Sequence, residues 1–117
     1  MRQDGKLDYL EMPGGDLPVV KAFYAGVFGW RFTDYGPEYA AFAEGLDGGF
    51  YADPKEAVPA PLPVLYSADL EATLAKVEAA GAEVTRPIFT FPGGRRFHFR
   101  DPAGNELAVW AEPNGAG

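Results

Sequence analysis

The chain has 117 residues, of which 47% are hydrophobic and 23% are charged, a length and composition that suit one globular domain. Its formal net charge of −7 argues against nucleic-acid binding, which needs a basic surface. The absence of cysteine excludes disulfides, thiolate metal sites and a cysteine nucleophile.

No targeting segment or membrane span is expected. No apolar run approaches the roughly 20 residues that cross a bilayer. The start, MRQDGKLDY, lacks the apolar stretch of a secretory signal. A chain without cysteine also fits a reducing compartment. We therefore expect a cytoplasmic protein with neither a nucleic-acid nor a membrane partner.

The expected elements follow one another in a pattern that occurs twice. The first module is expected to contain a strand at about 6–12, a helix from Leu17 to Phe28, and strands at about 31–35, 38–43 and 48–52. A linker rich in Pro and Ala follows at about 53–61. The second module is expected to contain a strand at about 62–67, a helix from Leu70 to Ala80, and strands at about 82–89, 95–100 and 106–111.

Local signals support these boundaries. Asp16 and Asp69 are expected N-caps, because a carboxylate can accept a backbone N–H of the first helical turn. The apolar faces are expected to consist of Leu17, Val20, Tyr24, Val27 and Phe28 in the first helix, and of Leu70, Leu74 and Val77 in the second. Turns are expected at Gly36-Pro37, Asp47-Gly48-Gly49, Pro92-Gly93-Gly94 and from Asp101 to Asn105.

The order βαβββ, linker, βαβββ gives each module a small sheet with a helix on one face. The other sheet face is left apolar and aromatic, so the two faces need to cover each other. The predicted fold class is α+β, with two paired βαβββ modules forming a curved mixed sheet around a cleft. We expect one domain over 1–117, with module one at about 6–52 and module two at about 62–112.

Three stretches are similar to a known family: DLPVVKAFYAGVFGW, DLEATLAKVEAAGAEV and FRDPAGNELAVW. They resemble the vicinal oxygen chelate superfamily, which includes glyoxalase I, the extradiol dioxygenases, and the fosfomycin- and bleomycin-resistance proteins. The similarity runs from about Lys6 to Glu112. It implies paired modules, a ligand site in a cleft and a homodimer. It does not fix the activity, because one fold hosts many functions.

Metal-bearing members of that family place four ligands on the first and last strands of the two modules. Counting from the capping Asp residues and from Asn105, the equivalent positions here are Tyr9, Gly49, Leu62 and Ala108. Leu, Gly and Ala have no side-chain donor, and a neutral Tyr, with an ordinary pKa of about 10, is a poor ligand. We expect no metal and no other cofactor; a divalent metal would require a different assignment of these positions.

Side-chain alternation along the strands adds further residues to the cleft face. The expected ligand-binding residues are Tyr9, Glu11, Tyr51, Tyr66, Glu106 and Trp110. Large rings with two carboxylates suit a small molecule that is cationic or aromatic. In the alternative, Glu106 faces solvent at its strand end, Glu11 pairs with a cation such as arginine, and the tyrosines are core or interface residues.

His98 is the only histidine, and an imidazole suits acid–base chemistry. It has no histidine partner and does not occupy a family ligand position, so we expect it at the surface or at the cleft edge. Its neighbours Arg95, Arg96 and Arg100 could clamp an anion with it, or pair with the surplus of acids. The catalytic residues stay unknown, with Glu11, Glu106 and His98 as weak candidates.

Two functional hypotheses remain, and the sequence leaves open whether the chain is an enzyme. In the first, it is a small-molecule-binding protein that lacks the usual metal site, works as a homodimer, and holds its ligand in an aromatic and acidic cleft. Drug sequestration of the bleomycin-resistance type is the nearest analogy. In the second, it is a glyoxalase-like lyase or isomerase, or a dioxygenase, with divergent site residues.

Overall fold

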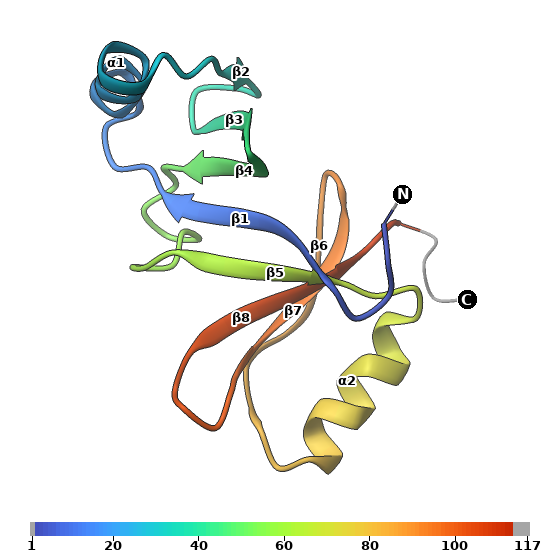
Figure 1. Cartoon of the computed structure of the whole chain (residues 1–117). Coiled ribbons are helices and arrows are strands. Elements are labelled where there is room, and N and C mark those ends of the chain that lie inside the picture. The colour runs from blue at the N-terminus through green and yellow to red at the C-terminus, as the bar shows by residue number, and fades with distance from the viewer. Residues whose placement is uncertain (1, 114–117) are drawn as a thin grey trace. The chain divides into compact units, whose positions relative to one another are not determined.

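The elements alternate as expected in the computed structural model, which describes residues 2–113. In chain order they are β1 (Leu7–Pro13), α1 (Leu17–Phe28), β2 (Thr33–Asp34), β3 (Tyr39–Glu44), β4 (Leu46–Tyr51), β5 (Leu62–Tyr66), α2 (Leu70–Ala79), β6 (Glu83–Phe91), β7 (Gly94–Arg100) and β8 (Glu106–Ala111) (Figure 1). This is the order βαβββ twice. The predicted α+β class and its two modules are confirmed.

The chain divides into two compact units. The first unit comprises residues 9–62, and the second comprises residues 1–8 together with 63–117. The start of β1 therefore belongs with the second module. Backbone bonds explain this, because Gly5 N donates to Tyr66 O at 2.7 Å and Tyr66 N donates to Lys6 O at 3.0 Å. A single domain over 1–117 with a linker at 53–61 stays a prediction.

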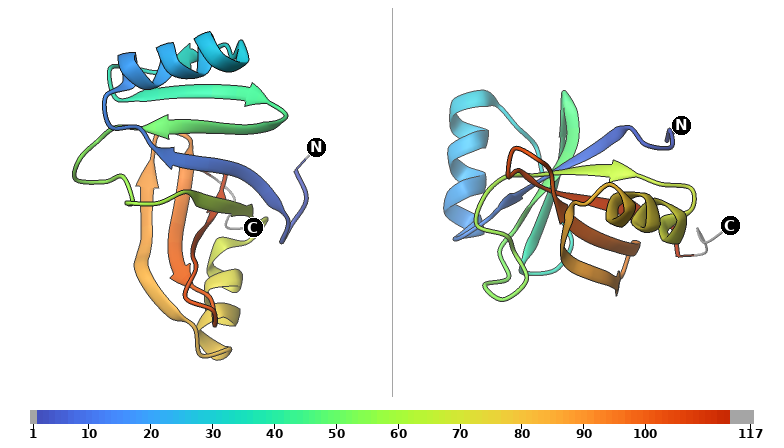
Figure 2. Two further views of the ribbon diagram at one scale, coloured as in Figure 1. Left: turned by 60° about the vertical axis from the view of Figure 1, so that its left-hand side comes forward. Right: turned by 90° about the horizontal axis from the view of Figure 1, so that it is seen from below.

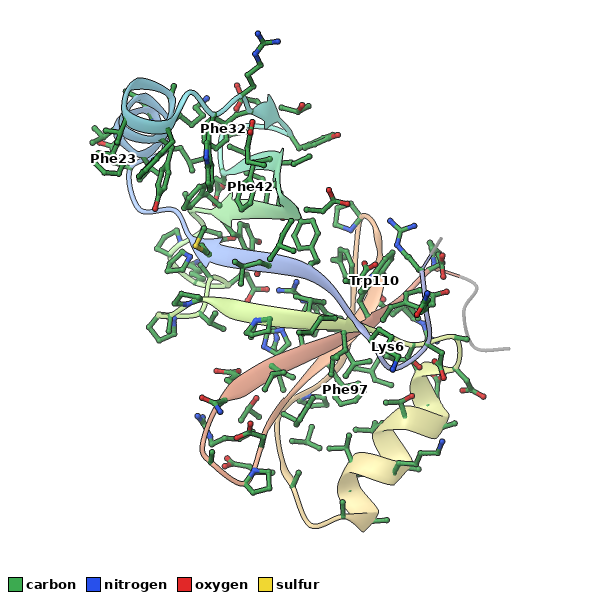
Figure 3. The ribbon with its side chains drawn as sticks, viewed as in Figure 1. Lys6, Phe23, Phe32, Phe42, Phe97 and Trp110 are labelled. Carbon is green, nitrogen blue, oxygen red and sulfur yellow. The ribbon has the colours of Figure 1, made fainter. Side chains whose placement is uncertain are left out.

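In the first unit, α1 covers one face of a sheet with the strand order β2-β3-β4-β1 (Figures 1 and 2). The β1–β4 pair is parallel and the other pairs are antiparallel. Leu17, Ala40, Phe42 and Phe50 form the buried core between helix and sheet, and Phe32 packs against them (Figure 3). The high aromatic content of the chain is concentrated here, so this unit obtains a dense core from few residues.

The expected ends of α1 are confirmed, but part of its expected apolar face is wrong. Asp16 caps the helix by accepting the Val19 N–H at 3.5 Å. Val27 and Phe28 are 58% and 62% exposed. The packing that covers the helix ends near Tyr24, whose ring stacks on Trp30 at 4.7 Å. Periodicity shows which face of a helix is apolar, but it does not show how far along the helix the neighbouring elements reach.

The turn expected at Asp47-Gly48-Gly49 is also wrong. The chain turns at Gly45, where φ is +106°, and β4 already begins at Leu46. Gly48 lies inside this strand. The space beside it is filled, since an added Cβ would lie 2.5 Å from Phe42 Cζ. Here glycine permits close packing and does not form a turn.

In the second unit, α2 packs on one face of a sheet with the strand order β5-β8-β7-β6 (Figure 1). The β5–β8 pair is parallel, and the pairs β8–β7 and β7–β6 are antiparallel. The core consists of Leu70, Phe97, Val109 and Ala111, with Leu74 and Val77 packed against it. The expected apolar face of α2 is confirmed, as is its cap, since Asp69 accepts the Ala72 N–H at 3.1 Å.

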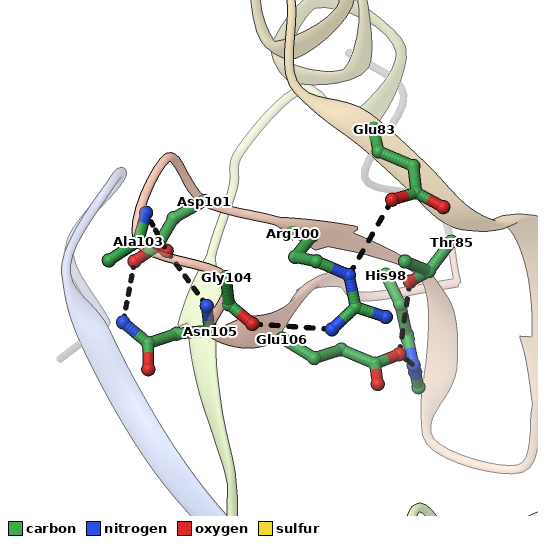
Figure 4. Close-up of polar contacts among 9 residues, drawn as sticks. All are labelled: Glu83, Thr85, His98, Arg100, Asp101, Ala103, Gly104, Asn105 and Glu106. Carbon is green, nitrogen blue, oxygen red and sulfur yellow. Dashed lines mark hydrogen bonds and ion pairs between the residues drawn. The ribbon is translucent and has the colours of Figure 1, made fainter.

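The turn expected from Asp101 to Asn105 is confirmed, and it positions the start of β8 (Figure 4). The Asp101 carboxylate accepts the backbone N–H groups of Ala103 and Asn105, each at 2.9 Å, and the Asn105 amide at 3.0 Å. Gly104 takes a φ of +92°. The hydrogen bonds from Asn105 and the turn backbone lower the pKa of Asp101.

Neither helix within the described range is long and apolar enough to cross a membrane.

Candidate functional site

In the first unit, the sheet face away from α1 carries the predicted site residues of that module. The strand register places Glu11 beside Gly49, and Tyr39 beside Tyr51. Because side chains alternate between faces along a strand, Tyr9 and Glu11 share a face with these residues. Glu11 is buried on this face, so its carboxylate is not exposed to solvent.

Three tyrosines on this face form a tyrosine cluster: Tyr9, Tyr39 and Tyr51. The hydroxyls of Tyr9 and Tyr39 are hydrogen-bonded to each other. The rings of Tyr39 and Tyr51 lie 5.7 Å apart between centroids, and the Tyr51 hydroxyl donates to Asp53 at 3.5 Å. Sequence reasoning missed Tyr39. The feature that could have indicated it is its position at the start of β3, where the antiparallel register pairs it with Tyr51.

Burial favours the protonated form of two of these phenols, Tyr9 and Tyr51. Burial raises the pKa of Tyr9, and the hydrogen bond to Tyr39 opposes this only in part. Burial also raises the pKa of Tyr51, with the negative charge of Asp53 as the next cause. A phenol binds a metal well only as the phenolate, so burial makes Tyr9 a still poorer metal ligand than an exposed tyrosine.

The space beside Gly49 is occupied by Tyr39. A Cβ added at Gly49 would lie 2.5 Å from Cζ of the Tyr39 ring. Carbon atoms in good contact stand about 3.5–4.0 Å apart, so no carboxylate or imidazole fits at position 49 while the ring is there. Two of the four family ligand positions, 9 and 49, are thus involved in contacts with one tyrosine.

The other two family ligand positions are apolar and closed. Leu62 and Ala108 are both 0% exposed. Within residues 2–113, no group of three or more His, Cys, Asp or Glu side chains could hold a metal ion. The divalent metals that metal-bearing members of the family bind need such donors. The residues at positions 9, 49, 62 and 108 therefore do not fit a divalent metal.

In the second unit, the sheet face away from α2 carries the remaining predicted residues. The register places Tyr66 beside Trp110, and His98 beside Ala108. Glu106, two residues before Ala108, lies on the same face. The six predicted ligand-binding residues thus form one group in each unit. That the two groups line one cleft stays a prediction.

Trp110, which is labelled in Figure 3, is the centre of an aromatic and acidic patch. Its ring meets that of Tyr66 edge to face at 5.5 Å. Its indole N–H donates to Asp8 at 3.0 Å, and the Arg2 guanidinium lies over the ring at 5.0 Å from its centroid. Arg2 Nε is 3.4 Å from the same Asp8 carboxylate. Sequence reasoning missed Asp8 and Arg2, which are remote in sequence from Trp110.

His98 is not at the surface, so that part of the expectation is wrong, while a place at the edge of a cleft stays a prediction. Its side chain is 1% exposed, because β7 lies inside the sheet between β8 and β6. Nδ1 of His98 is 3.2 Å from Oε2 of Glu106, and the Thr85 hydroxyl donates to the same oxygen at 3.0 Å (Figure 4). Glu106 therefore does not simply face solvent at its strand end.

The imidazole is held in its neutral form. Burial is the main cause that lowers the pKa of His98, and the charge of Arg96 adds to it. The contact with Glu106 acts in the opposite direction but does not prevail. Within the part of the chain that the structure describes, Nε2 of His98 is buried without a hydrogen-bond partner.

The arginines near His98 do not form one anion clamp. Arg95 points to the α2 face, where its Nη2 is 3.1 Å from the Glu71 carboxylate. Arg100 pairs with Glu83 at 3.5 Å and donates to the Gly104 carbonyl at 3.2 Å. For these two, pairing with the surplus of acids is the correct alternative.

Known structures share this architecture. The NAD-dependent benzaldehyde dehydrogenase of Legionella pneumophila is similar at 12% identity over 89% of this chain and 97% of that chain, with a TM-score of 0.73. A glyoxalase/bleomycin resistance protein/dioxygenase superfamily member of Vibrio splendidus 12B01 is similar at 16% identity over 92% of this chain and 99% of that chain, with a TM-score of 0.69. These identities show the fold alone.

A Mn(II)-bound glyoxalase of Novosphingobium aromaticivorans is 24% identical over 95% of this chain, with a TM-score of 0.64. This chain covers 40% of that longer protein. No curated protein matches the sequence. The profile of one family, however, matches residues 6–109, nearly the whole chain. The chain therefore belongs to the glyoxalase/bleomycin resistance protein/dioxygenase superfamily.

Proposed function

We propose that this protein binds a small molecule without the metal ion that metal-bearing relatives use. The observation that carries the proposal is the contact between Tyr39 and Gly49. Tyr39 fills the space that a ligand side chain at position 49 would need, and its hydroxyl engages Tyr9 at a second ligand position. Leu62 and Ala108 contribute no donor atoms.

The ligand we propose is cationic or aromatic. The Trp110 patch supports this, because the guanidinium of Arg2 already lies over the indole ring and beside Asp8. A ring face and a carboxylate attract a cation together. Tyr9, Glu11 and Tyr51 of the first unit complete the proposed aromatic and acidic cleft. We further propose that the protein works as a homodimer in the cytoplasm.

A second candidate is an enzyme, a glyoxalase-like lyase or isomerase or a dioxygenase with divergent site residues. The observation that favours it is the buried pair of His98 and Glu106, since a neutral imidazole oriented by a carboxylate is a common general base. The manganese-bound glyoxalase among the similar structures points to the same activity class. This candidate would need either a metal bound by other residues or chemistry without a metal.

Titration calorimetry tests the first proposal against the second. The tag-free protein is titrated with Mn²⁺, Ni²⁺ and Zn²⁺, and separately with aromatic quaternary ammonium compounds. The proposal expects no stoichiometric metal binding and saturable binding of an aromatic cation that weakens in Trp110→Leu. One metal ion bound per chain would contradict it. Turnover of a hemithioacetal or a catechol would favour the enzyme.

A further inference from the structure

His98 has one ring nitrogen whose hydrogen-bonding capacity is unused within the described residues. The side chain is 1% exposed, and Nε2 is buried without a hydrogen-bond partner among residues 2–113. A buried polar atom without a partner is costly, and in native proteins it calls for a specific explanation. A group on a bound ligand is one such explanation.

The other ring nitrogen fixes which role Nε2 can take. Nδ1 faces Oε2 of Glu106 at 3.2 Å, and the Thr85 hydroxyl holds the same oxygen at 3.0 Å. A carboxylate oxygen only accepts, so the Nδ1 atom must carry the proton. In a neutral imidazole the second nitrogen then has a lone pair and no proton. Nε2 is therefore an acceptor, and it needs a donor.

Burial and the surrounding charges keep the ring neutral. Burial is the main cause that lowers the pKa of His98. The charges of Arg96 on β7 and Arg86 on β6 add to this effect, while Glu106 on β8 opposes it. A ligand donor would thus meet an acceptor at neutral pH, and the acceptor would be lost only on acidification.

The strand beside His98 is irregular at this point. Arg86 of β6 is the register partner of His98, and the pairing shifts on both sides of it, between Val84 and Arg86 and between Arg86 and Phe89. β6 is an edge strand of the second unit's sheet, and Pro87 within the irregular stretch has no N–H to donate. Bulges of this kind commonly lie beside functional sites, where they redirect side chains.

The irregular strand also places an aromatic ring beside His98. The ring of Phe89 lies 5.6 Å from the imidazole, and the Arg86 guanidinium covers the Phe89 ring at 3.7 Å from its centroid. Because an edge strand is hydrogen-bonded on one side only, this cover can move with fewer broken bonds than a central strand. A planar group that displaces this cover would lie beside the imidazole.

We propose that Nε2 of His98 is the polar anchor of a ligand subsite in the second unit, and that it accepts a hydrogen bond from an O–H or N–H group on a planar ligand. This inference rests on the proposed function, because it assumes that a small molecule binds. It adds a chemical requirement: the ligand presents a donor, with Glu106 and Thr85 holding the imidazole in the accepting tautomer.

The test uses ¹⁵N NMR of the full chain, in which the single histidine makes the imidazole signals unambiguous. At pH 7.5 the expected state has a proton on Nδ1 and none on Nε2. Phenol is then added, and in a parallel titration anisole, which has the same ring but no donor. Phenol is expected to shift the Nε2 signal saturably, with an affinity about tenfold or more above that of anisole.

Two results would overturn the inference: a proton on Nε2 in the free protein, or an equal response to phenol and anisole, including none. His98→Phe is expected to abolish the discrimination between the two compounds. Thr85→Val leaves the imidazole in place and removes only the hydroxyl that holds Glu106, so it is expected to reduce the discrimination. Metal analysis of the same sample separates this inference from the proposed function, since only bound metal would contradict the latter.

Discussion

The ring of Tyr39 lies in the space into which a side chain at position 49 would project. An added Cβ at Gly49 would stand 2.5 Å from Tyr39 Cζ, well inside van der Waals contact. Tyr39 also hydrogen-bonds the hydroxyl of Tyr9. A single tyrosine therefore contacts the residues at two positions where metal-bearing relatives place ligands.

Gly49→Ala is expected to destabilise the protein by about 1–3 kcal/mol, the usual cost of forcing extra atoms into a packed site. Combined with Tyr39→Ala, the same change should cost far less, because the obstructing ring is gone. Urea denaturation of the two single variants and the double variant measures the coupling. Gly26→Ala is the control: nothing lies within 4 Å of its added Cβ in α1, so it should be neutral or stabilising. Additive costs at 49 and 39 would contradict the packing account.

Tyr9→Phe is expected to lower stability by about 0.5–1.5 kcal/mol at neutral pH, because it removes one partly buried hydrogen bond. It should also change the alkaline limb of the stability curve. Burial raises the pKa of Tyr9 in the folded state above its ordinary value near 10. Above that ordinary value the unfolded chain loses its proton first, so stability falls as pH rises through the folded pKa.

The measurement is urea unfolding between pH 8 and pH 11, with Tyr35→Phe as the control because Tyr35 is 66% exposed. The wild type and Tyr35→Phe should lose stability more steeply than Tyr9→Phe. Identical alkaline slopes for all three proteins would show that Tyr9 is not buried as described.

His98 should make stability depend on pH on the acid side. Its pKa is lowered in the folded state, chiefly by burial, from about 6.5 in the unfolded chain. As pH falls below about 6.5, the unfolded chain takes up a proton that the folded chain resists. The stability that the buried His98 contributes is therefore fully present above about pH 6.5, and it is lost as the pH falls through the pKa of His98 in the folded protein. In His98→Gln, the difference in stability between pH 7.5 and pH 5 should shrink, which equilibrium unfolding at the two values detects; an unchanged difference would contradict the burial.

The Trp110 patch yields a contrast between two neighbouring substitutions. Asp8→Ala removes the acceptor of the Trp110 indole N–H, so it should cost about 1 kcal/mol and alter Trp110 fluorescence. Arg2→Ala removes an exposed cation that lies over the Trp110 ring and pairs with Asp8, but it leaves the indole hydrogen bond in place, so it should cost about 0.5 kcal/mol or less. Trp30 also fluoresces, so the spectra are taken in a Trp30→Phe background. Equal effects of the two substitutions would mean that the Asp8–Trp110 bond is not made.

Local signals predicted the helices well. Asp16 and Asp69 begin them at the expected residues, because a cap acts on the next few backbone groups and needs no distant partner. The same holds for the turn from Asp101 to Asn105, whose hydrogen bonds all lie within five residues. The repeated module also predicted the order βαβββ twice and a mixed sheet, whereas the strand order and the parallel β1–β4 and β5–β8 pairs are known from the structure.

Properties that depend on distant residues could not be predicted from the sequence. Gly48 and Gly49 look like a turn, and only the positions of Phe42 and Tyr39 show that they are glycines for packing. His98 was expected at the surface or at the cleft edge. Its burial depends on the strands on both sides of β7, whose positions the sequence does not show. Thr85 and Asp8 gave no signal, since each is defined by a hydrogen bond to a residue far along the chain.

Native mass spectrometry of the tag-free protein, purified from cells without chelators, tests the central claim most directly. It reports oligomeric state, bound metal and any retained small molecule on one sample. The account predicts a dimer without metal, with any additional mass due to an organic compound that carries a planar donor group. A divalent metal ion retained at one per chain would contradict the account, and Tyr9, Gly49, Leu62 and Ala108 would no longer be the positions that determine the site.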